Sequence, residues 1–145
     1  MKGRKVLLVE DRQDDIDLTL RSLKENNITN KVDVVRDGAE ALDYIFAKGA
    51  YSHRNIEDLP SVILLDIKLP KIDGIEVLKR LRADERTKPL PVVILTSSRE
   101  ESDLINGYKF GCNSYVRKPI EFEEFSKAIK ELGLYWLLLN EPPVT

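Results

Sequence analysis

Short apolar runs recur along the chain, and a polar residue follows each of them. Runs without alternation are typical of strands that are buried on both faces of a parallel sheet. The segments between the runs carry apolar residues three and four positions apart, which predicts helices. The predicted strands cover residues 4–9, 31–35, 61–65, 92–95 and 114–116, and the predicted helices begin near residues 11, 38, 74, 98 and 122.

Five strand–helix units in series predict one α/β domain, a doubly wound parallel sheet with helices on both faces. Sites in such sheets form at the carboxyl ends of the strands. Residues 49–59 are polar and aperiodic, and we interpret this long connection as a partner-specific loop. Two helices have clear apolar stripes, formed by Ile16, Leu20 and Leu23 in the first and by Leu104, Ile105 and Tyr108 in the fourth.

Composition narrows the functional class. A chain of 145 residues that is 42% hydrophobic and 33% charged is expected to form one globular domain. Its net charge of -2 gives no basic field, so we expect no nucleic-acid partner. The apolar stretch Leu134 to Leu139 is far shorter than the about 20 residues of a spanning helix, which predicts no membrane insertion. The single Cys112 excludes an internal disulfide and fits the cytoplasm.

The polar residues at the predicted strand ends have complementary chemistry. They are Glu10 and Asp11 after the first strand, Asp66 after the third, Thr96 after the fourth and Lys118 after the fifth. Clustered carboxylates repel one another, and a hard divalent cation with oxygen ligands relieves that repulsion. An ammonium and a hydroxyl can bind phosphoryl oxygens, which leaves Asp66 as a nucleophile. Each residue alone also fits an ordinary turn, strand end or surface position. Together they predict metal-dependent phosphate chemistry.

The motifs around these residues resemble the receiver domain of two-component response regulators. The resemblance covers about residues 4–133 and implies a flavodoxin-like sheet with strand order 2-1-3-4-5. The motifs that carry it are Leu8-Val9-Glu10-Asp11, Leu64 to Pro70 with Asp73-Gly74, Leu95-Thr96-Ser97, and Tyr115 to Pro119.

The resemblance implies a role for each site residue. Asp66 accepts a phosphoryl group from the phosphohistidine of a sensor histidine kinase, and Lys118 contacts that group. Asp11 and Asp66 bind Mg2+ directly, with Mn2+ as an alternative, whereas Glu10 acts through water and Lys68 through its backbone carbonyl. Such a protein catalyses only its own phosphorylation and dephosphorylation, so it is not an enzyme with an external substrate.

The resemblance also implies a switch. Thr96 follows the phosphoryl group and Tyr115 turns inward, which changes the surface formed by the fourth helix, fifth strand and fifth helix. The Lys118–Pro119 peptide bond is expected to be cis. Two residues depart from the family pattern, since Glu10 replaces the commoner Asp and Lys68 places a cation beside the phosphorylation site.

Three features resemble, more narrowly, the single-domain regulators that pair with bacterial phytochromes: residues 10–15, the loop 49–59 and the ending 133–143. This resemblance implies a stand-alone receiver over residues 1–145, with a phytochrome kinase as one candidate partner. The apolar extension 134–145 follows the five strand–helix units, which already close the core. It therefore predicts a homodimer or a kinase-facing surface formed by Trp136, Leu137 and Leu138.

Three other functions are compatible with parts of this pattern. A flavodoxin would need a hydroxyl- and glycine-rich loop after the first strand, where residues 10–15 are acidic instead. An aspartate-nucleophile phosphatase would need a second carboxylate where Lys68 stands. The remaining alternative is a receiver-like interaction module that works without phosphorylation.

Overall fold

Strands and helices alternate along the chain, as the hydrophobic pattern predicts. The computed structural model describes residues 5–118 and 122–133. The strands are β1 Val6–Val9, β2 Val32–Val35, β3 Val62–Leu65, β4 Val92–Thr96 and β5 Ser114–Arg117. The α-helices are α1 Gln13–Glu25, α2 Gly38–Phe46, α3 Gly74–Ala83, α4 Glu101–Lys109 and α5 Phe122–Gly133. A short 3-10 helix, η1, covers Gly49–Tyr51.

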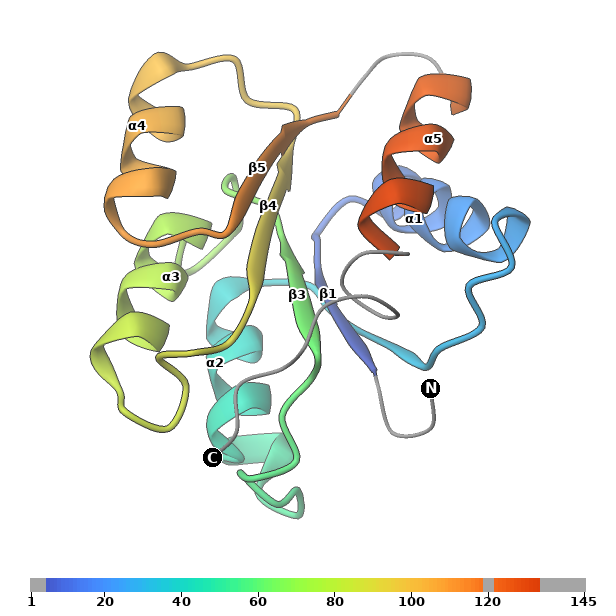
Figure 1. Cartoon of the computed structure of the whole chain (residues 1–145). Coiled ribbons are helices and arrows are strands. Elements are labelled where there is room, and N and C mark those ends of the chain that lie inside the picture. The colour runs from blue at the N-terminus through green and yellow to red at the C-terminus, as the bar shows by residue number, and fades with distance from the viewer. Residues whose placement is uncertain (1–4, 119–121, 134–145) are drawn as a thin grey trace.

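All five strands pair in parallel in the order β2-β1-β3-β4-β5. This order confirms the doubly wound flavodoxin-like sheet. Helices α2, α3 and α4 cover one face, and α1 and α5 cover the other (Figure 1). In the register, Val9 at the end of β1 pairs with Leu65 at the end of β3. The residues that follow these two strands therefore leave the sheet side by side.

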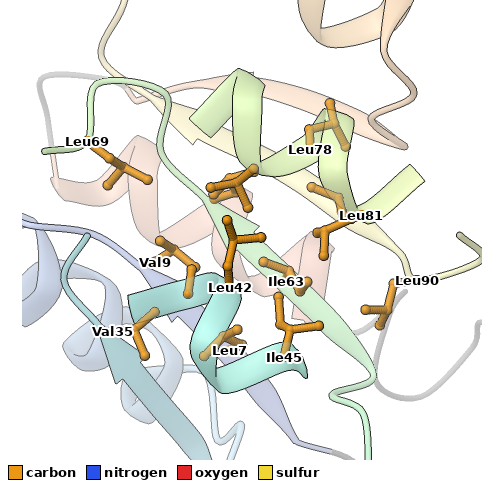
Figure 2. Packing of buried hydrophobic residues seen from close by; sticks show 14 of the residues in the cluster. Leu7, Val9, Val35, Leu42, Ile45, Ile63, Leu69, Leu78, Leu81 and Leu90 are labelled. Atoms are coloured by element: carbon orange, nitrogen blue, oxygen red, sulfur yellow. The ribbon is translucent and has the colours of Figure 1, made fainter. Parts of the chain in front are cut away.

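The core lies on both faces of the three central strands. Alternate residues of β1 point to opposite sides, so that Leu7 packs toward α2 and α3 while Leu8 packs toward α1. Figure 2 shows Leu7 and Ile63 gathered with Ile45 of α2 and Leu81 of α3, all fully buried. Each such side chain contributes about 1.5–3 kcal/mol when it is removed from water. The central strands are therefore a stable platform for the residues at their ends.

Three residues of the predicted apolar stripes are left exposed. Leu20 in α1 is 36% exposed, and Ile105 and Tyr108 in α4 are 61% and 56% exposed. Helix α4 lies beside β5 at the edge of the sheet and buries Asp103 and Gly107 instead. A Cβ on Gly107 would lie 2.9 Å from the side chain of the β4 residue Ile94, so the small residue permits close packing. Helix α4 also begins at Glu101, later than predicted.

The long connection before β3 is held by specific contacts. The Arg54 guanidinium stacks on the Tyr44 ring at 3.9 Å and donates to the backbone carbonyls of Tyr44 and Asp58. Lys5, just before β1, donates to the Asp58 carboxylate at 2.8 Å. The connection therefore lies at the amino ends of the strands, opposite the acidic residues. A partner role for it stays a prediction. Among the residues described, no helix is both long and apolar enough to cross a membrane.

Candidate functional site

Three carboxylates meet at the carboxyl ends of the central strands. Glu10 and Asp11 follow β1 directly, and Asp66 follows β3. The Asp66 amide donates to the carbonyl of Val9 at 3.1 Å, which continues the sheet pairing beyond β3. One oxygen atom from each of the three carboxylates lies within 4.8 Å of the others. The predicted acidic cluster therefore forms, and two of its members, Glu10 and Asp66, are buried at 2% and 5% exposure.

Lys118 is the cation of this group. It follows the edge strand β5, and its amide donates to the carbonyl of Thr96 at 2.8 Å. Its side chain is only 5% exposed, and the ammonium pairs with the Glu10 carboxylate and lies 3.8 Å from Oδ2 of Asp66. Thr96 ends β4 at the same edge and is fully buried. The strand-end residues that carry the predicted chemistry thus lie at one edge of the sheet.

The electrostatics of the group favour a bound cation. Burial, followed by repulsion from Asp66, raises the pKa of Glu10 to about 7, against the opposing effect of Lys118. Burial alone would lower the pKa of Lys118, but the carboxylates of Asp66 and Glu10 outweigh it and raise that pKa. One ammonium therefore faces more negative charge than it neutralises. Carboxylate oxygens at this spacing are the donors that a hard divalent cation takes, so the residues fit such an ion.

The loop after Asp66 is held tightly against the sheet. The Ile67 amide donates to Oδ1 of Asp66 at 2.7 Å, which fixes the orientation of that carboxylate. Asp73 caps α3 by accepting from the Glu76 amide at 3.0 Å. Gly74 begins the helix where a Cβ would lie 2.1 Å from the backbone oxygen of Asp66. Only glycine allows α3 to start this close to the acidic residue.

Lys68 points away from the carboxylate cluster. Its ammonium lies 3.3 Å from Oε1 of Glu100 and 3.3 Å from Oδ2 of Asp103, at the start of α4. Burial alone would lower the pKa of Lys68, but the hydrogen bonds and charges of Asp103 and Glu100 together outweigh it and raise that pKa. Asp103 also accepts a hydrogen bond of 2.6 Å from Ser98. The cation expected beside Asp66 therefore joins two loops across the site, and the metal contact from its backbone carbonyl stays a prediction.

Asp15 is a residue of this site that the sequence analysis did not identify. Its Oδ2 lies 3.3 Å from the Lys118 ammonium, and it comes from the first turn of α1 rather than from a strand end. A rule based on strand ends could not find it. The available signal is helical phase, because Asp15 lies four and seven positions before the buried Thr19 and Ser22 and so on the inward face of α1.

Tyr115 occupies the expected place for a switch residue. It lies in β5 opposite Ile94 of β4, and its hydroxyl oxygen is buried. Its ring centre is 6.5 Å from that of Tyr108 on α4. Strand β5 and helix α4 therefore meet at this side chain, although its movement stays a prediction.

Two predictions fall outside the described residues. The Lys118–Pro119 bond includes a residue outside the described ranges, so its expected cis geometry is untested. The expected interface residues Trp136, Leu137 and Leu138 also lie beyond residue 133.

Comparison with known proteins decides the family. The profile of the response regulator receiver domain matches residues 6–130. The chain belongs to this family. Among curated relatives of this receiver, response regulator Rcp1 of Synechocystis sp. is 35% identical over 91% of this chain and 88% of its own length. The probable methanogenesis regulatory protein FilR2 of Methanothrix harundinacea is 38% identical over 95% of this chain and 86% of its own.

Solved structures of similar receivers cover nearly the whole chain. Phosphorylated RcpA, a cyanobacterial phytochrome response regulator, superposes with a TM-score of 0.89 at 35% identity, over 97% of this chain and 99% of that one. The Mn2+-bound form of Rcp1 gives 0.88 at 33% identity over the same shares. The bacteriophytochrome response regulator AtBRR is 51% identical with a TM-score of 0.75, over 95% of this chain and 98% of that one.

Proposed function

We propose that this receiver stores a signal as a phosphoryl group on Asp66. The observation that carries the proposal is the buried Asp66 carboxylate itself. It lies with Glu10 and Asp11 in one cluster and has a buried ammonium, that of Lys118, 3.8 Å from its Oδ2. A carboxylate held in this way can act as a covalent nucleophile toward phosphorus. The similarity to phosphorylated RcpA supports the same assignment.

We assign the acidic cluster to Mg2+, with Mn2+ as an alternative. Asp11 and Asp66 would bind the ion directly, Glu10 through water, and Lys68 through its backbone carbonyl. The similarity to the Mn2+-bound form of Rcp1 supports a divalent ion at such a cluster. When bound, the ion neutralises charge on the carboxylates and on the phosphoryl oxygens.

The phosphoryl transfer uses side chains whose positions are already fixed. An Asp66 oxygen attacks the phosphorus of a phosphohistidine, the P–N bond breaks, and its electron pair stays with the histidine nitrogen. The product on this chain is an acyl phosphate. Lys118 neutralises a phosphoryl oxygen, while the Ile67 amide keeps the other carboxylate oxygen in place. Catalysis of this kind is self-modification and involves no external substrate.

Thr96 and Tyr115 would carry the state of Asp66 to the surface. Thr96 ends β4 where that strand pairs with Arg117 of β5, and Tyr115 lies two residues earlier in β5. Tyr115 also faces Tyr108 of α4. A hydroxyl that moves toward a phosphoryl oxygen therefore has a short path to the face formed by α4, β5 and α5.

A sensor histidine kinase is the proposed phosphodonor, and a bacterial phytochrome is the proposed kinase. The similarity to RcpA, a phytochrome response regulator, and to AtBRR, a bacteriophytochrome response regulator, supports the light input. A cytoplasmic location fits a phosphohistidine donor. FilR2, a probable methanogenesis regulatory protein, has a comparable identity to this chain. Similarity of this degree therefore does not by itself establish a light input. We propose that this receiver binds no nucleic acid and inserts in no membrane.

The alternative, an interaction module that works without phosphorylation, explains less of the site. A binding surface needs accessible charges, whereas Glu10, Asp66, Thr96 and Lys118 are all nearly inaccessible to a protein partner. Burial of these charged groups costs stability, and a role in chemistry explains why they are buried.

Incubation with acetyl phosphate and Mg2+, followed by intact-mass analysis, tests the proposal. The wild type should gain one phosphoryl group, and excess chelator should abolish the gain. Asp66→Asn should not be labelled. Asp73→Asn is the matched control, because it changes the other carboxylate of the same loop and Asn caps a helix as well as Asp does. Full labelling of Asp66→Asn, or of the wild type in chelator, would refute the mechanism.

A further inference from the structure

The Lys118 ammonium has three carboxylate neighbours, and one of them has no part in the acidic cluster. Glu10 is its nearest partner, Asp15 is 3.3 Å away and Asp66 is 3.8 Å away. A lysine ammonium has three N–H donors, so it can face several carboxylates at once. The metal-compatible cluster consists of Glu10, Asp11 and Asp66 and does not include Asp15. Asp15 is therefore a partner of Lys118, and at 3.7 Å also of Arg12, rather than a member of the metal-compatible cluster.

The three carboxylates differ in how far their side chains are exposed to solvent. The side chains of Glu10 and Asp66 are 2% and 6% exposed, whereas Asp15 is 23% exposed. Glu10 and Asp66 leave the sheet from β1 and β3, and Asp15 reaches the ammonium from α1. Asp15 therefore holds Lys118 from the solvent side, where a phosphodonor must enter.

We propose that Asp15 is a positioning residue that holds the Lys118 ammonium toward the mouth of the site and out of a direct hydrogen bond with Asp66. This inference rests on the proposed phosphorylation of Asp66. At 3.8 Å, the ammonium is beyond hydrogen-bond distance of the Asp66 oxygen. The oxygen thus stays open to phosphorus, and the ammonium already faces the arriving phosphoryl group.

Removal of the Asp15 charge leaves Lys118 with two buried partners. The flexible ammonium is then drawn inward by Glu10 and Asp66, and it closes on the nucleophile. A charge-assisted hydrogen bond to Asp66 would have to break before each transfer. Asp15→Asn should therefore slow the chemical step and leave donor binding unchanged.

The contacts of Asp15 define a matched control. Asp14 lies in the same first turn of α1, is exposed, and is not among the carboxylates that pair with Lys118. Asp14→Asn removes the same charge from the same helix terminus, so both variants lose a similar favourable interaction with the helix dipole. Only Asp15→Asn changes the coordination of the ammonium.

The experiment compares wild type, Asp15→Asn, Asp14→Asn and Asp15→Glu with acetyl phosphate at saturating Mg2+. The maximal labelling rate of Asp15→Asn should fall on the order of tenfold, since misplacement of a positioned group costs up to about 10²-fold. Its half-saturating donor concentration should stay within about twofold, and Asp14→Asn should label like wild type. Asp15→Glu should recover most of the rate. The 15N signal of the Lys118 ammonium should move in Asp15→Asn and not in Asp14→Asn.

Each other outcome is decisive. If wild type is labelled and Asp15→Asn is labelled at least as fast, or if Asp14→Asn slows equally, Asp15 has no positioning role. An unchanged Lys118 signal in Asp15→Asn leads to the same conclusion. If wild type itself is not labelled, the proposed function fails and the positioning role fails with it. Thermal unfolding of each variant shows whether a lost rate reflects lost folding. If Asp15→Asn does not fold, the labelling rate of Asp15→Glu is compared with that of wild type instead.

Discussion

Single atoms set the distance between Asp66 and α3. Because a Cβ at Gly74 would lie 2.1 Å from the Asp66 carbonyl oxygen and 2.8 Å from Cα of Ile67, its clash would be with backbone atoms. No side-chain rotation can relieve such a contact. Alanine is favoured over glycine inside helices by about 1 kcal/mol, but by less at the first position. The steric cost of the Cβ should therefore exceed the gain in helix propensity.

We therefore expect Gly74→Ala to destabilise the fold by roughly 2 kcal/mol, within the range of overpacked cores. It should also slow phosphorylation, because the displaced segment carries Asp66. Urea unfolding and the acetyl phosphate assay check the two effects. Lys79→Ala, an exposed substitution in the same helix, is the control. Stability equal to wild type would show that the start of α3 can move away freely.

The residues of the site differ in how far the sequence reveals them. Glu10, Asp11, Asp66 and Lys118 could be placed together, because each follows a predicted strand and parallel strands end at one edge. Asp15 could not, since its role depends on the angle at which α1 leaves β1. The direction of Lys68 could not be predicted either, because Glu100 and Asp103 attract it from another segment.

At the scale of elements, periodicity predicts which face of a helix is apolar but not how much of that face is covered. Helix α4 has an apolar stripe, yet Ile105 and Tyr108 remain exposed because only the edge of the sheet lies beside them. The hydrophobic pattern predicted all five helices and the family resemblance implied the strand order, but neither predicted this uncovered side. The extent of cover depends on the tilt of each helix, which no local pattern specifies.

Helix α2 and the edge strand β2 are joined by one buried hydroxyl. Tyr44 donates to the Asp33 carboxylate, and burial together with that carboxylate raises the pKa of Tyr44 far above its usual 10.0. A raised pKa in the folded state gives stability that is present below pH 10 and lost as pH rises further. Tyr44→Phe should cost about 1–2 kcal/mol at pH 7, and its deficit should shrink at pH 11.

Urea unfolding of wild type and Tyr44→Phe at the two pH values measures this link. Tyr108→Phe is the control, because that tyrosine is exposed on α4. The same deficit at pH 7 and pH 11 would show that the Tyr44 hydroxyl does not couple folding to proton binding.

At the scale of the whole molecule, we expect a homodimer formed through the extension after Gly133. Its apolar residues include Trp136, Leu137 and Leu138. Burial of about 300 Å2 across a two-fold interface, at about 25 cal/mol per Å2, gives roughly 7 kcal/mol before association costs. Light scattering over a concentration series should show a dimer for the full chain and a folded monomer after truncation at Gly133. Replacement of the three residues by serine should act like the truncation, and a monomer in every case would contradict the prediction.

The two sides of the proposed phosphorylation site are built differently. On one side, the Gly38 amide donates to the Pro70 carbonyl at 3.3 Å, and a Cβ there would lie 1.8 Å from the Ile72 carbonyl oxygen. On the other side, side chains make the ties, through Ser98 with Asp103 and through Lys68. Side-chain ties rearrange more easily than close backbone contacts do. A biosensor built on this protein therefore needs its fluorophore on α4, and a fluorophore on α2 would serve as the internal reference.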